Sequence, residues 1–194
     1  MRYEKGRKDS SRTKIMEVAS ERFRKDGIAA SGLATIMSDA GLTNGAFYPH
    51  FASKAELVRA CVVHALEAQS QQLQGALDIG GMEAVILTYL SPEHRDDPAK
   101  GCASAALLPE IARQPVETRQ AYTEQFKSLV DTLSVALEHT KDPQGVALGV
   151  VATLFGTLEL ARAVEDKELS DRILAAGAEA VRSLLHAPQI DDAA

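Results

Sequence analysis

Apolar residues recur at helical spacing along almost the whole chain, and this pattern limits the possible folds more than any other feature of the sequence. Between residues 15 and 23 they occupy positions i, i+3, i+4 and i+8 on one helical face, namely Ile15, Val18, Ala19 and Phe23. The same period returns between residues 122 and 137. No segment shows the sustained alternation and turn chemistry of strands. The sequence therefore predicts an all-α chain of about nine or ten helices without internal repeats.

Glycine and hydroxyl residues divide the N-terminal third into short helices. Gly27 is expected to end the first helix in a left-handed conformation, and Ser31 to cap a short second helix. Gly41 can take the positive φ of a sharp turn, after which Thr43 can cap a third helix. Pro49 cannot donate a backbone hydrogen bond, so this third helix should close or kink within about two turns. The order helix, glycine turn, helix is the arrangement that presents a second helix to the major groove of DNA.

The remaining two thirds carry further helix boundaries. Ser53 and Glu56 predict a capping box at the start of a long helix, and Gly80 and Gly81 predict its end. The polar stretch at residues 93–97, EHRDD, is expected to be a loop. Later helices are expected to begin at four cap signals: Asp97-Pro98, Pro115, Asp142-Pro143 and Ser170.

The charge of the chain is distributed unevenly. The net charge is −6, but residues 1–59 hold eleven Lys or Arg against seven Asp or Glu, which leaves +4 there and −10 in the remainder. A basic N-terminal third joined to an acidic body indicates that only the former meets a polyanion. We therefore expect a flexible basic arm at residues 1–9, a helix-turn-helix domain at 10–53, a larger helical domain at 54–186 and a loose tail at 187–194.

Other classes of protein lack support in the sequence. No apolar h-region follows the charged N-terminus and no apolar run approaches the ~18 residues that cross a bilayer, which predicts a soluble, cytoplasmic protein without a membrane partner. Cys61 and Cys102 lack the spacing of a zinc site or a disulfide framework, so we expect reduced thiols and no metal. The sequence lacks the motifs of several enzyme classes: HExxH, GxSxG, phosphate-binding glycine loops and ferritin-like carboxylate spacing. This argues against the alternative of an all-α enzyme or ligand carrier, and we expect no cofactor.

The N-terminal third resembles the TetR family of one-component bacterial transcriptional regulators. The residues that carry the resemblance are Phe23, Gly27, Ile36, Ala40-Gly41-Leu42-Thr43, Gly45-Ala46-Phe47-Tyr48, His50-Phe51, Ser53-Lys54 and Leu57. The rest of the chain matches only in helix number and character. The resemblance implies a homodimeric repressor that a small-molecule effector releases from a palindromic double-stranded DNA operator. Gly32 and Pro49 depart from the residues usual in the family, which puts at least one backbone contact with DNA in doubt.

Four residues at the start or on one face of the expected reading helix are placed to approach base edges: Thr43, Asn44, Gly45 and Tyr48. The Asn44 amide can both donate and accept, as an adenine edge requires, and Gly45 lets the backbone come close. Ala46, Phe47 and Phe51 are better assigned to the small core.

Further DNA contacts follow from the resemblance alone. It implies that Tyr48, His50 and Lys54 touch phosphates or flanking bases, and that Ser31 with its helix N-terminus holds the other strand. The alternative for Ser31 is an N-cap without any role in DNA binding, and the same holds for Thr43. Tyr48 and His50 have the alternative of ordinary polar surface residues.

A two-fold operator requires a dimer surface, and the later helices offer one. Small residues recur at helical spacing at Gly145, Gly149, Ala152 and Gly156, which lets another helix approach closely. The final helix adds three more residues to this surface, Ile173, Ala180 and Leu184. Pairing with the symmetry mates would form a four-helix bundle, which the resemblance also implies. The alternative is that the small-residue stripe is packed inside the monomer.

By resemblance, the middle helices enclose an effector pocket. Its expected wall residues are Tyr89, Cys102, Leu108, Tyr122, Phe126, Phe155, Glu159 and Arg162. Most of them are equally well explained as core residues, with Glu159 and Arg162 as an i,i+3 surface pair. A helix kinked at Pro109 is expected to transmit the effect of ligand binding to the helix-turn-helix domains of the dimer.

Cys102 offers an alternative form of control. Its position at a predicted helix start beside Lys100 could make the thiol reactive toward oxidants or electrophiles, as in some members of the family. The competing interpretation is a small buried apolar residue. A further alternative, an architectural DNA protein that senses nothing, would need basic charge over more of the chain than residues 1–59.

Overall fold

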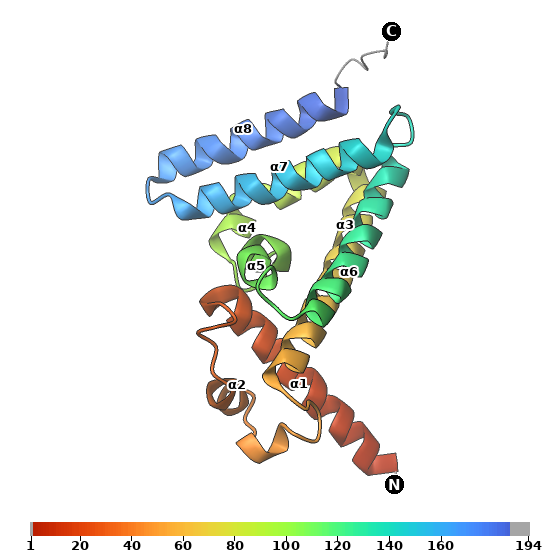
Figure 1. The fold of residues 1–194 in the computed structure, drawn as a ribbon. Coiled ribbons are helices and arrows are strands. Elements are labelled where there is room, and N and C mark those ends of the chain that lie inside the picture. Colours follow the sequence, from red (N-terminus) through yellow and green to blue (C-terminus); the bar gives the residue numbers. More distant parts are fainter. Residues whose placement is uncertain (1, 187–194) are drawn as a thin grey trace. The chain divides into compact units, whose positions relative to one another are not determined.

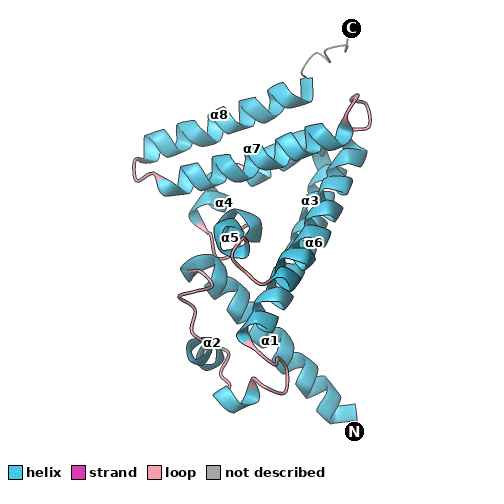
Figure 2. Cartoon of the chain, in the orientation of Figure 1, coloured by secondary structure: helices cyan, strands magenta, loops and turns pink. Residues whose placement is uncertain are grey.

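The computed structural model describes the backbone of residues 2–186 and the side chains of residues 10–186. Within the described range the chain is helical and contains no strand, which confirms the all-α prediction (Figures 1 and 2). The elements are α1 (Arg2–Asp26), α2 (Leu33–Asp39), the short 3-10 helix η1 (Asn44–Ala46), α3 (Lys54–Tyr89), α4 (Pro92–Asp96), α5 (Ala103–Ile111), α6 (Val116–Ala136), α7 (Pro143–Ala163) and α8 (Lys167–His186).

The first helix begins earlier than expected. It starts at Arg2, so the described part of the stretch expected to be a flexible arm, residues 2–9, has a helical backbone. Arg, Lys and Glu are good helix formers, and each residue added to an existing helix gains a hydrogen bond without a new nucleation step. The predicted tail at 187–194 lies outside the described residues.

The glycine turns of the N-terminal third are formed as predicted. Gly27 has a φ of 86° and Gly41 a φ of 66°. After α2, the Gly41 amide donates to the Ser38 carbonyl at 2.9 Å and the Leu42 amide to the Met37 carbonyl at 2.9 Å. This pair of bonds is the Schellman pattern that ends a helix sharply. The chain therefore leaves α2 in a defined direction toward η1.

The long helix α3 also begins and bends as predicted. The Ser53 hydroxyl accepts from the Glu56 amide at 3.1 Å, and the Glu56 carboxylate accepts from the Ala52 amide at 2.8 Å. These are the two bonds of a capping box, shifted by one residue at the second bond. Non-helical backbone at Gly80 and Gly81 divides α3 into two segments.

Two predictions around α4 and α5 were wrong. Residues 93–97 were expected to be a loop, but residues 92–96 form α4, which the Ser91 hydroxyl caps by accepting from the His94 amide at 3.1 Å. Asp97-Pro98 does not begin the next helix. The chain first makes a turn in which the Gly101 amide donates to the Pro98 carbonyl at 3.3 Å, and α5 then starts with Cys102 as its N-cap.

Asp142 and Ser170 show how a cap depends on its surroundings. Asp142 caps α7 as predicted, because its carboxylate accepts from the Gly145 amide at 2.9 Å. Ser170 does not cap α8, which begins at Lys167 with the Asp166 carboxylate accepting from the Leu169 amide at 3.0 Å. The Ser170 hydroxyl is buried and donates to the Ala161 carbonyl at 2.6 Å.

The chain divides into two compact units. Unit 1 comprises residues 1–67 and 98–125, and unit 2 comprises residues 68–97 and 126–194. The expected boundary after residue 53 does not coincide with this division, because the core of unit 1 joins residues of α1, α2 and α3 with Leu107 and Ile111 of α5. The helix-turn-helix thus shares its core with a segment more than fifty residues further along the chain.

In unit 2, α7 and α8 pack closely against each other. Thr157 is buried on α7, and a Cβ atom built on Gly177 of α8 would lie 2.2 Å from its side chain, so only glycine permits this approach. Arg95 anchors α4 to the start of α8, since its guanidinium donates to the Ser170 hydroxyl at 3.0 Å and to the Asp171 carboxylate at 2.5 Å.

Helix α7 is more apolar than the sequence analysis recognised. Among the described residues it is the one helix long and apolar enough to cross a membrane by length and composition, with a mean hydropathy of 1.5 over the tested window. The expectation that no apolar run approaches that length was therefore wrong. A core helix of a soluble protein meets the same test, and 44% of this window is buried.

Candidate nucleic-acid interface

The segment expected to read DNA is a 3-10 turn rather than an α-helix. The Ala46 amide donates to the Thr43 carbonyl at 2.9 Å and the Phe47 amide to the Asn44 carbonyl at 3.2 Å. Turns then continue to His50, whose amide donates to the Phe47 carbonyl at 2.9 Å. Pro49 has no amide hydrogen to extend a helical ladder through this segment. The predicted brevity is confirmed, and the segment is even shorter than two turns of α-helix.

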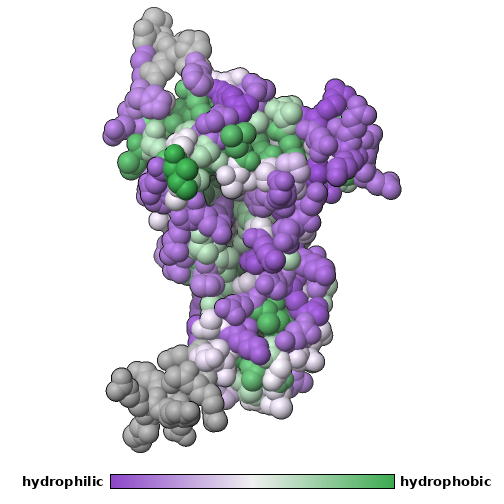
Figure 3. Space-filling model, turned by 180° about the vertical axis from the view of Figure 1, so that it is seen from behind, coloured by the Kyte–Doolittle hydropathy of each residue, from purple (hydrophilic) through white to green (hydrophobic). Residues whose placement is uncertain are grey.

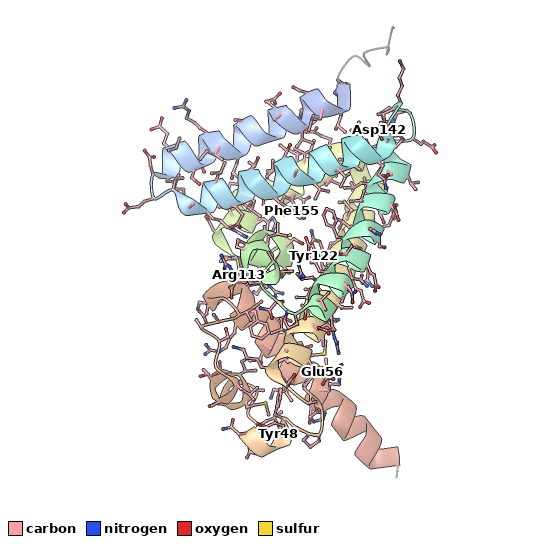
Figure 4. The ribbon with its side chains drawn as sticks, in the orientation of Figure 1. Tyr48, Glu56, Arg113, Tyr122, Asp142 and Phe155 are labelled. Carbon is pink, nitrogen blue, oxygen red and sulfur yellow. The ribbon has the colours of Figure 1, made fainter. Side chains whose placement is uncertain are left out.

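Two buried aromatic rings pack under this turn and join it to the core of unit 1. Phe47 and Phe51 are fully buried, and their rings stack with centroids 5.6 Å apart. Tyr48 meets Phe47 edge-on at 5.5 Å while 67% of its surface stays exposed, and Figure 4 shows it at the end of unit 1 that carries η1. The predicted core role of Phe47 and Phe51 is confirmed. The turn is consequently a rigid platform with one exposed side.

The exposed side carries the residues predicted to approach base edges. Thr43, Asn44, Gly45 and Tyr48 are all exposed. A Cβ atom on Gly45 would meet nothing within 4 Å, so the backbone is uncovered at this point. Thr43 stands at the N-cap position of η1, but its side chain makes no capping hydrogen bond. The alternative of Thr43 as a capping residue is therefore not supported.

Three other predicted contacts have less open surroundings. Ser31 is only 1% exposed and its hydroxyl donates to the Gly27 carbonyl at 2.7 Å. It is also not the N-cap of α2, which is Gly32. The N-cap expectation for Ser31 is therefore wrong: its hydroxyl closes the turn after α1, and its burial leaves little surface for DNA. Lys54 is half-buried and donates to the Ile28 carbonyl at 2.6 Å, and His50 is half-buried.

Basic residues of α1 lie beside this turn, which the sequence analysis did not single out. The Arg12 guanidinium lies 4.8 Å from the centre of the Phe51 ring, a cation–π distance. The Lys14 ammonium lies 3.7 Å from the position of a Cβ on Gly41. Arg22 pairs with Asp26 at 3.0 Å and with Asp39 of α2, and the Asp39 hydrogen bond raises the pKa of Arg22. Arg12 and Lys14 are exposed and add positive charge next to the turn at residues 43–50, which we call the reading turn.

The N-terminal segment is similar in sequence to known bacterial regulators. Residues 15–61 match the model of the bacterial regulatory proteins of the tetR family. The regulator ArpR of Pseudomonas putida is 39% identical over 83 residues, 40% of each chain, and TtgR of Pseudomonas putida is 50% identical over 50 residues, 26% of this chain and 24% of TtgR. The N-terminal part of this chain is thus similar to the TetR family of bacterial regulators.

The TetR-family match to curated regulators is confined to part of their length. The chain matches less than half of ArpR and about a quarter of TtgR. A likeness of fold covers far more, because the crystal structure of Escherichia coli NemR in its reduced form superposes with a TM-score of 0.78 over 93% of this chain and 100% of NemR, at 19% identity. The TetR-type fold thus extends beyond the matched N-terminal segment.

The residues predicted to line an effector pocket fall into two groups, one in each unit. In unit 2, Tyr89 stacks on Phe155 at 6.0 Å and meets the His94 ring edge-on at 4.7 Å. The His94 ring also bonds the Tyr89 carbonyl at 2.7 Å, and burial lowers the pKa of His94. His94 was not predicted; a histidine in a polar stretch gives no sign of burial. Phe126 is half-buried on α6.

Arg162 closes the same region of unit 2 from α7. Its guanidinium donates to the His94 carbonyl at 2.8 Å and to the Arg95 carbonyl at 3.2 Å, which ties α7 to α4. It also pairs with Glu159 at 3.5 Å, the i,i+3 arrangement named as the alternative to a pocket role. Burial raises the pKa of Glu159 despite this partner. Glu159 and Arg162 are thus accounted for by contacts within unit 2.

The group in unit 1 contains Cys102, Leu108 and Tyr122. The Tyr122 hydroxyl bonds the Ser104 hydroxyl at 3.2 Å, and burial raises the pKa of Tyr122. Cys102 is 6% exposed and its sulfur accepts from the Ala105 amide at 3.4 Å. This burial matches the interpretation of Cys102 as a small buried residue.

The small-residue stripe of α7 lies mainly on the surface of unit 2. Gly145, Ala152 and Gly156 are exposed, and Gly149 packs near Leu184 of α8, whose side chain would lie 3.7 Å from a Cβ on Gly149. The stripe is therefore not packed inside the monomer. Gly145 also has a role in the helix start, because a Cβ there would lie 2.0 Å from the Asp142 carboxylate, so the glycine leaves room for the N-cap side chain.

Apolar side chains flank the stripe on both helices. Leu148 is 45% exposed and Leu160 is 61% exposed on α7, and Leu184 is 36% exposed on α8. Ala180 is exposed and Ile173 half-buried. Figure 3 shows hydrophobic residues gathered between hydrophilic ones on a face of unit 2. Unit 2 thus exposes an apolar face on α7 and α8, which we call the α7/α8 face and define by Leu148, Ala152, Gly156, Leu160 and Leu184.

Proposed function

We propose that this chain is a transcriptional regulator that binds double-stranded DNA through the exposed side of residues 43–48. The observation that carries the proposal is the combination of an exposed, hydrogen-bonding surface with a buried aromatic platform in one short turn. A rigid platform holds donors and acceptors at fixed positions, as recognition of base edges requires. The match of residues 15–61 to a family of bacterial regulators supports the same function.

Each residue of the turn has a proposed role in reading DNA. Asn44 is the direct reader, because its amide can both accept from and donate to an adenine edge. The uncovered backbone at Gly45 lets the turn enter the groove. Thr43, Tyr48 and His50 contact phosphates or flanking bases, and the Lys54 ammonium has three donors, so its bond to Ile28 still leaves donors for a phosphate.

The regulator is proposed to act as a homodimer that pairs through the α7/α8 face. Large exposed apolar residues on two adjacent helices, separated by small residues, allow a second copy to approach closely and bury them. A two-fold dimer would place two reading turns on the two halves of a palindromic operator.

Control by a small molecule is the last part of the proposal. We place the effector against the middle helices, with the aromatic group of Tyr89 and Phe155 in unit 2 as its first contact, and we propose that binding releases a repressor from its operator in the cytoplasm. The similarity of residues 15–61 to the TetR family supports this role. A ligand that lowers operator affinity must bind the DNA-free form more tightly than the DNA-bound form.

The experiment that tests DNA reading is selection of bound fragments from genomic DNA with the purified protein. Affinities of the selected site and its point variants are then measured for the wild type, Asn44→Ala and a control, Gln120→Ala, whose exposed residue lies on α6. We expect Asn44→Ala to lose preference at one base position by about 1–3 kcal/mol while Gln120→Ala binds like the wild type. Equal preferences in Asn44→Ala and wild type would show that another residue reads the base.

A further inference from the structure

The corner between α1 and α2 is held by a carboxylate from α5. Glu110 accepts from the Ile28 amide at 3.0 Å with one oxygen and from the Ala29 amide at 2.9 Å with the other. The two sequence positions are separated by about eighty residues. Hydrogen bonds from backbone amides to a carboxylate are charge-assisted, which makes them stronger than bonds between neutral groups.

Gly27 makes room for this contact. Its φ of 86° turns the chain out of α1, and a Cβ atom at this position would lie 2.7 Å from a Glu110 oxygen. The positive φ favours glycine at this position, and the missing Cβ leaves room for the carboxylate. From the other side, the Lys54 ammonium donates to the Ile28 carbonyl at 2.6 Å. Both peptide groups of Ile28 are therefore fixed by distant side chains.

Helix α5 is itself firmly placed in unit 1. Leu107 and Ile111 are each 4% exposed and belong to the core that contains the helix-turn-helix. Just before α5, the Ala99 carbonyl accepts from the Arg24 guanidinium of α1 at 2.5 Å. Glu110 therefore connects the corner to an element that also packs into the core of unit 1 through Leu107 and Ile111.

We propose that Glu110 is a positioning residue for DNA recognition. By fixing the corner at residues 27–29, it sets the direction in which α2 leaves α1, and hence the orientation of the reading turn that follows α2. The DNA-binding surface is complete only when α5 holds this corner. The inference rests on the proposed function and adds a residue outside the helix-turn-helix to it.

The test compares Glu110→Ala and Glu110→Gln with the control Glu124→Ala, which removes an exposed carboxylate from α6 in the same unit. Three quantities are measured on folded, full-length protein: the affinity for the selected DNA site, the slope of that affinity against salt concentration, and hydrogen exchange at the Ile28 and Ala29 amides. The slope counts the phosphates that the protein contacts. A residue with only a structural role would change the melting temperature without changing the slope.

We expect Glu110→Ala to bind the site about tenfold more weakly or worse, with a shallower salt slope and faster exchange at both amides. Glu110→Gln should lie between Glu110→Ala and the wild type, because its amide group keeps one acceptor oxygen. If Glu110→Ala does not fold, the same comparison is made with Glu110→Gln. Glu124→Ala should match the wild type.

Two results would overturn the inference. Wild-type affinity and slope in a folded Glu110 variant with accelerated exchange would show that the contact does not position the reading turn. Unchanged exchange at both amides would show that the contact is not made in solution. A wild-type protein that selects no DNA would instead overturn the proposed function, so the two failures are distinguishable.

Discussion

Replacing Gly177 by alanine should destabilise the chain, although the same change in a helix normally stabilises it. Gly177 lies within α8, where alanine is favoured over glycine by about 1 kcal/mol. A Cβ atom there would lie 2.2 Å from both the Cγ2 and Oγ1 atoms of Thr157 and 2.7 Å from its Cβ. Because the Thr157 Cβ is itself too close, no rotation of the side chain relieves the contact, and α7 and α8 must move apart.

The expected magnitude follows from these opposing contributions. Overpacking of a buried contact costs about 1–3 kcal/mol, and a conflict that involves the rigid Cβ lies at the upper end of that range. Subtracting the helix preference of about 1 kcal/mol leaves a net loss of about 2 kcal/mol. For a chain of this size, that corresponds to a fall in melting temperature of roughly 4–8 °C.

Thermal denaturation followed by circular dichroism measures this effect. Gly75→Ala is the matched control, because Gly75 lies within α3 and a Cβ there would meet nothing within 4 Å. Its melting temperature should rise, by roughly 2–4 °C. A rise of similar size in Gly177→Ala would refute the close approach of α7 to α8.

Three further outcomes are expected. Leu160→Glu, on the α7/α8 face, should convert the proposed dimer to a monomer in sedimentation experiments. The control Val135→Glu changes a residue of α6 that is 72% exposed and should leave the dimer intact. If Leu160→Glu is still a dimer, the α7/α8 face is not the dimer interface. Cys61, whose pKa burial raises to about 11, should resist alkylation at pH 8 until urea unfolds the chain, and rapid labelling of the folded protein would contradict its burial. Burial lowers the pKa of His94 in the folded state, so the unfolded state binds the proton more readily and the free energy of unfolding should fall as the pH drops below about 6.5. His94→Gln should flatten this dependence in urea titrations at pH 5 to 7. If the change of stability with pH is the same in the variant, other groups cause it.

The sequence predicted the features that depend on residues close together in the chain. The glycine turns at Gly27 and Gly41 follow from backbone freedom, and the caps at Ser53 and Asp142 join groups three residues apart. The outward side of the reading turn could also be predicted, because the aromatic residues Phe47 and Phe51 favour the core. Local pattern alone therefore predicted the all-α class and the exposure of Thr43, Asn44, Gly45 and Tyr48.

Hydroxyl residues were harder to interpret, because the same side chain can cap a helix or bond a buried carbonyl. Ser31 and Ser170 were both expected to be caps, and both are buried with hydroxyls that donate to carbonyl oxygens. Which use prevails depends on the elements that cover the residue, as the Ala161 partner of Ser170 shows. A helix start read from a single serine is consequently less secure than one read from a serine with a glutamate three residues later.

Only the tertiary structure decided which distant groups support the turn at residues 43–50. The Glu110 carboxylate accepts from the Ile28 and Ala29 amides, but no sequence pattern pairs Glu110 with a turn some eighty residues earlier. Likewise, Lys54 looked like a phosphate contact, but its ammonium also holds the Ile28 carbonyl. The sequence by itself determined the all-α class and the chemistry of the turn, because those depend on neighbours along the chain. The orientation of the turn depends on packing and hydrogen bonds between α1, α2 and α5, which form only when the chain is folded.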